Sequence, residues 1–254
     1  MRKTFAPLLL SILLLNVCVF SQQQADTEFD AKVARPAYKG KKHPRVLFDE
    51  AHNNIHNATR GYKPFADLIS NDGYVVKPNE QKFQAATLKG YDVLVIVNAM
   101  GALLPAMADA GKPAFTDEEC DAVRDWVRAG GSLLLITDHA PTGSAAKILA
   151  SRFGVEMSTG TTGDDEYYNQ ERKNPGWLIF TREPPGGLIL EHPITSGRDK
   201  QERVARVETF TGQSLKVPSG GSVLLKLSDK AYDVTPEHPD GLSAAGRAQA
   251  VALK

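Results

Sequence analysis

Two apolar stretches joined by one capped helix constrain the fold of this chain more than any other feature. The first, 92–98 (DVLVIVN), is apolar on both faces, as is typical of a central strand in a parallel sheet. Thr116 and Glu119 have the spacing of a capping box, and the helix that they start ends at 130–131 (GG). The second apolar stretch, 132–137 (SLLLIT), follows immediately. This order predicts two parallel strands with the helix crossing over between them.

Strands and helices alternate through the first part of the chain, and mainly strands follow. A polar stretch at 159–176 separates the two parts and is too long for a tight turn. The alternation predicts an α/β protein with a doubly wound, mostly parallel sheet and helices on both faces. Further strands are expected at 46–48, 74–76, 178–180, 188–190, 204–210, 223–227 and 248–254, and further helices at 64–72 and 145–153.

The N-terminal residues have the pattern of a secretory signal peptide. Two basic residues at 2–3 (RK) precede an apolar run at 8–20, and Ser21 is a suitable cleavage point before a polar stretch. The apolar run is shorter than the ~20 residues that a membrane span needs. We therefore expect an exported protein, periplasmic or secreted, with no transmembrane span once the signal is cleaved.

The remaining chain divides into a linker and one domain. Residues 22–44 are polar, and the strand and helix pattern begins at Arg45. The last stretch starts a strand with no turn after it, which leaves a truncated C-terminus open. The expected division is a signal peptide (1–21), a linker (22–44) and one α/β domain (45–254).

Charge and cysteine content exclude several classes of partner and cofactor. Lys and Arg together number 30, as do Asp and Glu, so the formal net charge is zero and no nucleic-acid partner is expected. Only Cys120 remains after signal cleavage, which excludes an internal disulfide and a cysteine zinc site. No feature of the sequence indicates an oligomeric state.

Polar residues follow three of the expected strands. The first strand, in 45–52 (RVLFDEAH), has the form of a helicase-type ATPase motif, but no glycine-rich phosphate loop accompanies it, which excludes an ATPase. The third strand ends at Asn98, and the fourth runs into 138–139 (DH). Because ligands bind beyond the carboxyl ends of parallel strands, we predict one pocket at this edge of the sheet. Its predicted catalytic residues are Asp49, His52 and His139, and its predicted ligand-binding residues are Glu50, Asn53, His56, Asn98 and Asp138.

Each of these residues also has a purely structural alternative. Asp49 and Asp138 could cap the turn that follows each strand, and the histidines could be hydrogen-bonded loop residues. His52 and His56 have the four-residue spacing of a metal-binding helix, although the two Asn residues between them favour a loop. A divalent metal ion therefore stays open, and no other cofactor is expected. If the histidines contact a ligand, changing His52 or His139 to Ala should leave the melting temperature nearly unchanged.

Five segments together carry a family resemblance. They are 46–56 (VLFDEAHNNIH), 91–99 (YDVLVIVNA), 115–143 (FTDEECDAVRDWVRAGGSLLLITDHAPTG), 191–198 (EHPITSGR) and 205–215 (ARVETFTGQSL). The chain resembles the class I glutamine amidotransferase-like superfamily, in an uncharacterised branch near the trehalose-utilisation (ThuA-like) and gliding-motility (GldG-like) domains. The resemblance implies a flavodoxin-like fold and implies little about chemistry.

The chain departs from the parent family at the catalytic position. Amidotransferases place a nucleophilic Cys directly after a central strand, where this chain has 137–141 (TDHAP). Cys120 lies in the predicted helix instead, so we expect no glutaminase activity. Three functions stay open: a domain that binds a small molecule or glycan, an envelope hydrolase with a His/Asp or metal site, and an accessory subunit of an envelope transporter or gliding apparatus.

Overall fold

The structure, a computed structural model, describes residues 25–103, 106–183 and 187–254, so the predicted signal peptide lies outside the described residues. Four parallel strands form one sheet in the order β2-β1-β3-β4. These strands are β1 (Arg45–Asp49), β2 (Val75–Asn79), β3 (Val93–Val97) and β4 (Ser132–Ile136). The accompanying helices are α2 (Lys63–Asn71), α3 (Ala85–Leu88), the 3-10 helix η1 (Met107–Asp109), α4 (Asp117–Arg128) and α5 (Thr142–Ser151).

The strands predicted to be parallel neighbours are neighbours. Val95 of β3 lies opposite Phe48 of β1 on one side and Leu134 of β4 on the other, both in parallel register. The helix between β3 and β4 begins at the predicted capping box, in which Thr116 and Glu119 each bond the backbone N–H of the other. The prediction of an α/β protein is confirmed by this part of the chain.

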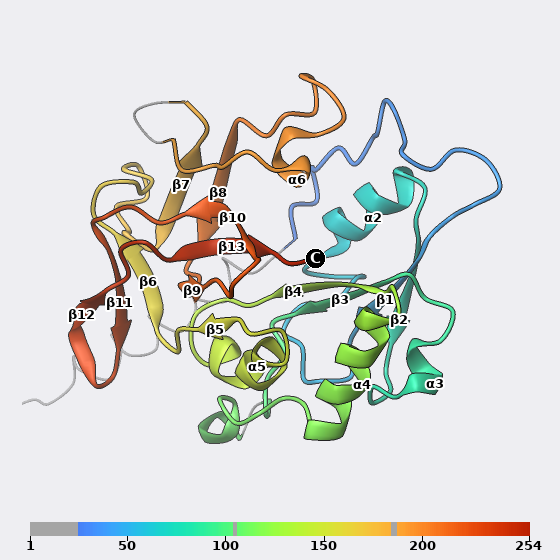
Figure 1. Ribbon diagram of the computed structural model, residues 1–254, viewed down its shortest axis with the longest axis horizontal. Coiled ribbons are helices and arrows are strands. Elements are labelled where there is room, and N and C mark those ends of the chain that lie inside the picture. Colours follow the sequence, from blue (N-terminus) through green and yellow to red (C-terminus); the bar gives the residue numbers. More distant parts are fainter. Residues whose placement is uncertain (1–24, 104–105, 184–186) are drawn as a thin grey trace, which may run out of the picture.

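Helices cover both faces of the parallel sheet (Figure 1). Successive side chains of a strand point to opposite faces, so a strand buried on both must be apolar throughout. Leu94 and Ile96 of β3 pack in the core shared with α3, α4 and α5. Val95 and Val97 pack in a second core, shared with α2. All four of these side chains are fully buried, which explains why β3 has no polar position.

The second half of the chain is antiparallel. Its described residues form three sheets, in the orders β10-β13-β9-β5, β12-β11-β6 and β7-β8. The prediction of a mostly parallel sheet therefore holds for the first half only. The elements are β5 (Glu156–Met157), β6 (Thr161–Asp164), β7 (Trp177–Thr181), α6 (Pro193–Ser196), β8 (Arg206–Phe210), β9 (Leu215–Lys216), β10 (Ser222–Lys226), β11 (Ala231–Thr235), β12 (His238–Ser243) and β13 (Ala248–Ala252).

Several side chains join the two halves. Thr137 Oγ1, just after β4, donates to Gln213 Oε1 at 2.5 Å. Gly143, in the first turn of α5, lies against the same amide, because a Cβ there would be 2.1 Å from Gln213 Nε2. Leu135 of β4 packs with Val251 of β13 in a small separate core. The carboxyl end of β4 is thus the point where the antiparallel half meets the parallel half.

Residues 25–44 contain no helix or strand and run beside α2. The backbone N–H of Tyr38 donates to the Asp72 carbonyl at 3.0 Å. Arg35 forms ion pairs with Asp199 at 2.6 Å and Glu202 at 3.0 Å. The described part of the expected linker is therefore held against the domain, and the boundaries between signal, linker and domain stay a prediction.

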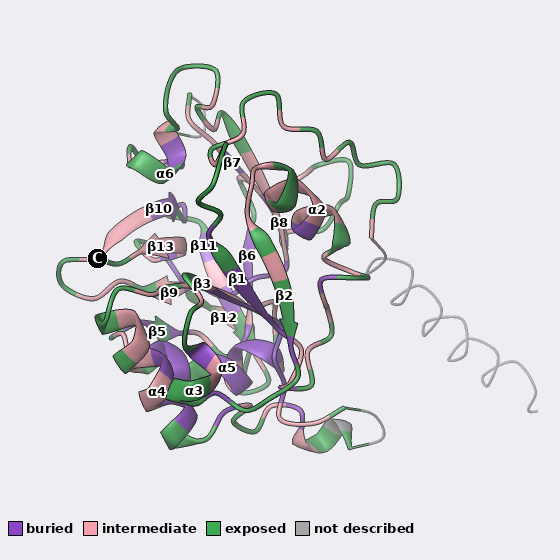
Figure 2. Ribbon diagram, turned by 90° about the vertical axis from the view of Figure 1, so that its right-hand side faces the viewer, coloured by how far each residue is buried: buried purple, intermediate pink, exposed green. Residues whose placement is uncertain are grey.

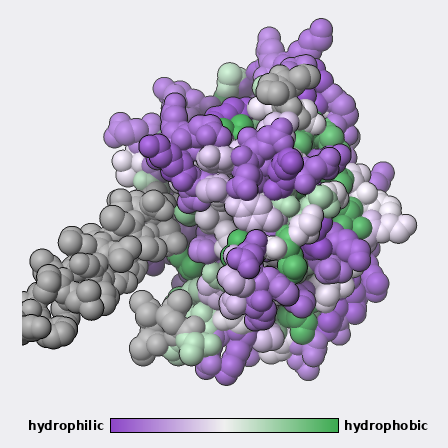
Figure 3. Space-filling view, turned by 90° about the vertical axis from the view of Figure 1, so that its left-hand side faces the viewer, coloured by the Kyte–Doolittle hydropathy of each residue, from purple (hydrophilic) through white to green (hydrophobic). Residues whose placement is uncertain are grey.

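Burial is concentrated in the central strands. Figure 2 shows β1 and β3 buried and β2, at one edge of the sheet, largely exposed. On the face turned to the viewer in Figure 3, hydrophobic residues form small patches among polar ones. Across the described ranges, no helix has the length and apolar character needed to cross a membrane.

Candidate functional site

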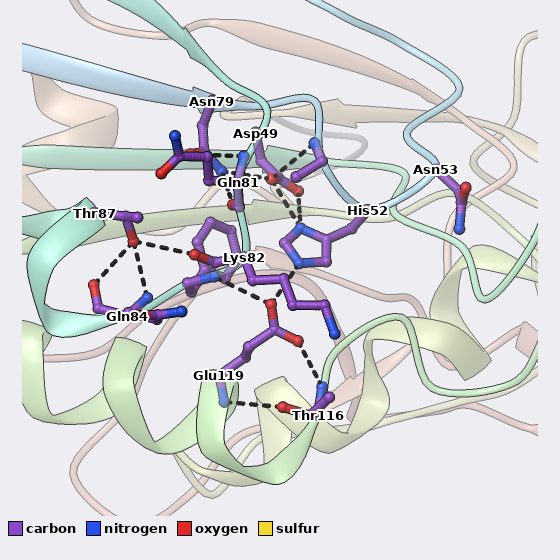
Figure 4. Close-up of polar contacts among 12 residues, drawn as sticks. Asp49, His52, Asn53, Asn79, Gln81, Lys82, Gln84, Thr87, Thr116 and Glu119 are labelled. Atoms are coloured by element: carbon purple, nitrogen blue, oxygen red, sulfur yellow. Dashed lines mark hydrogen bonds and ion pairs between the residues drawn. The ribbon is translucent and has the colours of Figure 1, made fainter.

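The loop after β1 holds a buried histidine between two carboxylates. Asp49 is the last residue of β1, and its two oxygens lie 2.9 Å and 3.0 Å from His52 Nδ1. The other ring nitrogen, Nε2, lies 2.9 Å from Glu119 Oε1 in the first turn of α4 (Figure 4). Asp49 is fully buried and His52 is 5% exposed. We call these three residues the buried triad.

The surroundings of the buried triad favour a charged histidine. The His52 ring packs against the rings of Phe83 and Phe115, with centroids 4.6 Å and 4.7 Å away. Burial alone would lower the pKa of His52, but hydrogen bonds and charge from Asp49 and Glu119 outweigh it and raise that pKa above its ordinary value. An imidazolium donates from both nitrogens, which matches an acceptor at each of them.

Glu119 has a second function at the start of α4. Its Oε2 accepts the backbone N–H of Thr116 at 3.0 Å, and its Oε1 also accepts the backbone N–H of Phe83 at 3.1 Å. Burial would raise the pKa of Glu119, but the Thr116 N–H and the contact with His52 lower it. The helix cap and the histidine therefore share one carboxylate.

The contacts of the buried triad are those of a structural group that holds the loop after β1 in place. Both nitrogens of His52 are engaged and its ring is covered, so no position is left for a proton to move to a ligand. The amide of Asn54 ties the same loop to β3, donating to Asp49 Oδ2 at 3.1 Å and to the Val97 carbonyl at 3.0 Å. The catalytic assignment of Asp49 and His52 stays a prediction, and these contacts favour a structural role instead.

A second polar group lies at the carboxyl ends of β3 and β4. Asn98 follows β3 with a left-handed backbone (φ 47°), a conformation that Asn tolerates better than most residues. Its Oδ1 accepts the backbone N–H of Asp138 at 2.9 Å. The Thr142 hydroxyl contacts the same N–H at 2.9 Å and donates to the Asp138 carbonyl, also at 2.9 Å. The turn after β4 is therefore fixed from both sides.

Asp138 in turn holds His139. Asp138 Oδ1 accepts the backbone N–H of His139 at 2.7 Å and lies 3.1 Å from His139 Nδ1. The contact with Nδ1, which is an ion pair when His139 is protonated, lacks the alignment of a good hydrogen bond. Asp138 raises the pKa of His139, and burial offsets part of that rise. The His139 side chain is 43% exposed and that of Asp138 is 16% exposed, so solvent reaches both.

His56 and Tyr62, in the loop after β1, lie within range of the charge of the same carboxylate. Their rings lie 5.5 Å apart. Burial lowers the pKa of His56 and the charge of Asp138 raises it in part, while burial and Asp138 both raise the pKa of Tyr62. Thr211, between β8 and β9, donates its hydroxyl to Asp138 Oδ1. Together, Asn98, Asp138, His139, His56, Tyr62 and Thr211 are the edge site.

The remaining predicted ligand-binding residues have partners within the loops. The Glu50 carboxylate accepts the backbone N–H of Ala58 at 3.0 Å. The Asn53 amide donates to the Met100 carbonyl at 3.2 Å, and Asn53 itself is left-handed (φ 50°). These contacts hold the loop in its conformation, and a ligand-binding role for Glu50 and Asn53 stays a prediction.

Neither polar group is arranged as a metal centre. In the described ranges, no three His, Cys, Asp or Glu side chains come together in a way that could hold a metal ion. His52 and His56 do not share a helix, since the loop after β1 contains none. The metal alternative therefore has no ligand set among these residues.

The sequence does not identify three of the residues that complete these groups. For Glu119 it predicts only a helix cap, because its partner His52 is 67 residues away. Thr211 lies 73 residues from Asp138, and Tyr62 follows a loop without a regular pattern. Only the polar ends of the parallel strands give a signal. The placement of Cys120 within the helix is confirmed; it is fully buried there, and burial raises the pKa of its thiol to about 11.

The fold and the edge site define an α/β protein with a polar, half-exposed site beyond a parallel sheet. No protein-family model and no curated protein sequence matches the chain. Among solved structures, the mmIFT52 N-terminal domain is similar at a TM-score of 0.55 and 13% identity, over 73% of this chain and 74% of that one. At this identity the likeness shows a shared fold and nothing of function.

Two further solved structures are more distantly similar. One is a protein from Thermoplasma acidophilum described as one of the subunits of GMP synthase, with a TM-score of 0.40 and 9% identity over 77% of this chain and 76% of that one. The other is a ThuA-like protein from Bacteroides uniformis, with a TM-score of 0.38 and 15% identity over 84% and 86%.

Proposed function

We propose that the protein binds a small, hydroxyl-rich ligand such as a glycan at the edge site. The observation that carries this proposal is the exposure and position of the His139 side chain. Its side chain is 43% exposed, it is fixed by a carboxylate, and it stands at the carboxyl end of a parallel strand. Open parallel sheets bind ligands at this edge.

The polar groups of the edge site suit a ligand that donates hydrogen bonds. Each side-chain contact of Asp138 in the described chain uses Oδ1, which leaves Oδ2 to accept from a ligand. No Lys or Arg in the described ranges pairs with Asp138. A carboxylate with no Lys or Arg beside it attracts hydroxyl and amine donors and repels phosphates and carboxylates. Neutral sugars are therefore better ligands for this site than sugar phosphates.

A binding experiment tests the proposal. Isotope-labelled protein is titrated with neutral chito-oligosaccharides and, separately, with an acidic sugar such as sialic acid, and amide shifts are followed by NMR. We expect saturable shifts at Asp138 and His139 with the neutral ligands only, and none in His139→Ala. His238→Ala is the matched control, because His238 lies on β12 in the antiparallel half. Equal binding by His139→Ala and the native chain would contradict the proposal.

A hydrolase is the second candidate, supported by the orientation of His139. Asp138 faces Nδ1, so a neutral imidazole with its proton there presents Nε2 as a base to solvent. Because the pKa of His139 is raised, such a base gains activity as the pH rises through that value. Hydrolysis of p-nitrophenyl glycosides and esters should then fall ~10²–10⁴-fold in His139→Gln, the usual contribution of a general base. Unchanged rates in that variant would remove the candidate.

We further propose that the parallel sheet is flavodoxin-like and doubly wound, as the superfamily resemblance implies. The order β2-β1-β3-β4 supports this, because it equals the first four strands of the flavodoxin order. Helices on both faces support it too. A crystal structure with β4 antiparallel to β3, or with every helix on one face, would contradict it.

We also propose that the protein is exported and that Ser21 is the cleavage point, on the strength of the N-terminal sequence. Expression of the full chain in a bacterial host and N-terminal sequencing of the extracytoplasmic protein should give Gln22 as the first residue. An accessory part in an envelope transporter or gliding apparatus remains a proposal; copurification of such components with the tagged protein from the native membrane would support it.

A further inference from the structure

Thr211 has a backbone conformation that its side chain disfavours. Its φ is 42°, in the left-handed region, where a β-branched residue is a genuine outlier. Its backbone N–H donates to the Gly176 carbonyl at 2.8 Å, which helps to hold the turn between β8 and β9. Residues kept in such conformations cluster at functional sites, where the surrounding structure over-determines them.

The left-handed turn carries the Thr211 hydroxyl to the parallel half of the molecule. That hydroxyl donates to Asp138 Oδ1, and Thr211 is only 8% exposed. The same oxygen accepts the His139 backbone N–H and faces His139 Nδ1 at 3.1 Å. Three contacts from two directions thus fix a carboxylate that would otherwise rotate freely about its terminal bond.

We propose that Thr211 is a positioning residue, whose hydroxyl holds the Asp138 carboxylate with Oδ1 against the His139 ring and Oδ2 free for a ligand. The inference rests on the edge site as the proposed binding site. It adds that the antiparallel half sets the protonation of a histidine in the parallel half.

Among the residues that the structure describes, few charged or titratable groups affect this carboxylate. His139 faces it from the turn after β4. The charge of the carboxylate also favours the protonated forms of His56 and Tyr62, in the loop after β1. The Thr211 hydroxyl, which carries no charge, approaches from the antiparallel half. If the hydroxyl is removed, the carboxylate can turn toward solvent, and His139 loses the partner that raises its pKa.

NMR titration of the histidines tests this directly. The protein without residues 1–21 is labelled with ¹³C-histidine, the ring Cε1–H signals are followed from pH 5 to pH 9, and His139→Gln assigns the His139 signal. We expect the pKa of His139 to fall toward that of an ordinary histidine in Thr211→Val, which keeps the shape and loses the hydroxyl. Thr211→Ser, which keeps the hydroxyl, should retain the native titration.

Thr209 provides the matched control. It lies two residues before Thr211, and its hydroxyl donates to Gln249 instead of Asp138. Thr209→Val should therefore leave the titration of His139 in place, and Thr211→Ala offers a second hydroxyl-free variant if the valine does not fold. A titration of His139 that is unchanged or shifted upward in both hydroxyl-free variants would overturn the proposal.

The result is independent of whether a glycan binds. Suppose that Thr211→Val lowers the pKa of His139 while no ligand shifts the amide signals of Asp138 or His139. The positioning role of Thr211 then stands and the proposed function fails. If ligands bind at the edge site and the titration of His139 does not change in the hydroxyl-free variants, the proposed function stands and the positioning role of Thr211 fails.

Discussion

At the scale of single residues, two histidines beyond the same parallel sheet have opposite surroundings. His52 is 5% exposed and lies between two carboxylates, whereas the side chain of His139 is 43% exposed and has one. The sequence places both at strand ends and predicts that either tolerates replacement by Ala. Burial changes that expectation for His52, because removing it leaves two buried carboxylates facing each other.

We predict that His52→Ala lowers the free energy of unfolding by about 3–5 kcal/mol, the usual cost of breaking a buried ion pair. His139→Ala should change it by less than about 0.5 kcal/mol, as most exposed substitutions do. Urea denaturation followed by circular dichroism measures both. Equal effects of the two substitutions would contradict a structural role for His52.

The pH dependence of stability should also report the buried triad. The pKa of His52 is raised above its ordinary 6.5, so its contribution is complete below that value and is lost as the pH rises through the folded-state pKa. The pKa of Glu119 is lowered below 4.5, so its contribution is complete above that value and is lost as the pH falls through the folded-state pKa. The stability difference between the native protein and His52→Gln should therefore be largest between pH 4.5 and pH 6.5. A difference that grows steadily at still higher pH would contradict this.

Cys120 should be unreactive in the folded protein. It belongs to α4, its side chain is fully buried in the core, and the high pKa of its thiol disfavours the thiolate. We expect Ellman's reagent to label it only after denaturation. Cys120→Ser should destabilise by about 1–3 kcal/mol, because it buries a hydroxyl among apolar side chains. Rapid labelling of the native protein, or glutaminase activity that this change abolishes, would contradict the placement.

At the scale of elements, helix α4 begins on a carboxylate that also serves the buried triad. Glu119→Gln should therefore destabilise more than Glu118→Gln, although both remove one negative charge from the first turn. For Glu118 we expect less than about 0.5 kcal/mol, as for other exposed changes. For Glu119 we expect a loss of more than about 1 kcal/mol, because a hydrogen bond to a charged partner is lost. Thermal unfolding of both variants measures the difference.

Elements with strong local signals could be predicted from the sequence, and elements without them could not. Helix α4 begins where its capping box predicts, and β3 and β4 are apolar stretches of ordinary strand length. Helix α5 begins three residues before the prediction. Its N-cap residue, Pro141, makes no side-chain hydrogen bond, so the sequence has no capping signal at that point. Strand β6 (TTGD) lies inside the stretch predicted to be a polar loop, and residues 188–190 form only an isolated bridge. In both places, pairing with distant strands decides the structure.

The same limit applies to the candidate site. Asp138, His139 and Asn98 could be predicted from the ends of their strands, because a parallel sheet delivers those ends to one edge. Thr211 could not, since its hydrogen bond to Asp138 depends on how the antiparallel half packs. Nor could the burial of His52, which depends on a helix far along the chain.

At the scale of the molecule, the two halves meet at Gly143 and Gln213. We predict that Gly143→Ala destabilises by about 1–3 kcal/mol, as overpacking usually does, because its Cβ would lie 2.1 Å from Gln213 Nε2. Gly111→Ala is the matched control, since the nearest atom to its Cβ is an ordinary 3.7 Å away. Chemical denaturation compares them. A Gly143→Ala variant as stable as the control would mean that the contact between the halves is loose.

The contribution of Thr211 to Asp138 has a consequence for when the proposed binding site is complete. The parallel half emerges first during synthesis and contains Asp138 and His139, yet it lacks the hydroxyl that orients them. A nascent chain, or one cut before β8, would present a histidine with a less constrained carboxylate. If the edge site binds the proposed ligand, its affinity would depend on β8 and the turn after it, and a chain that ends before Thr211 would bind that ligand more weakly.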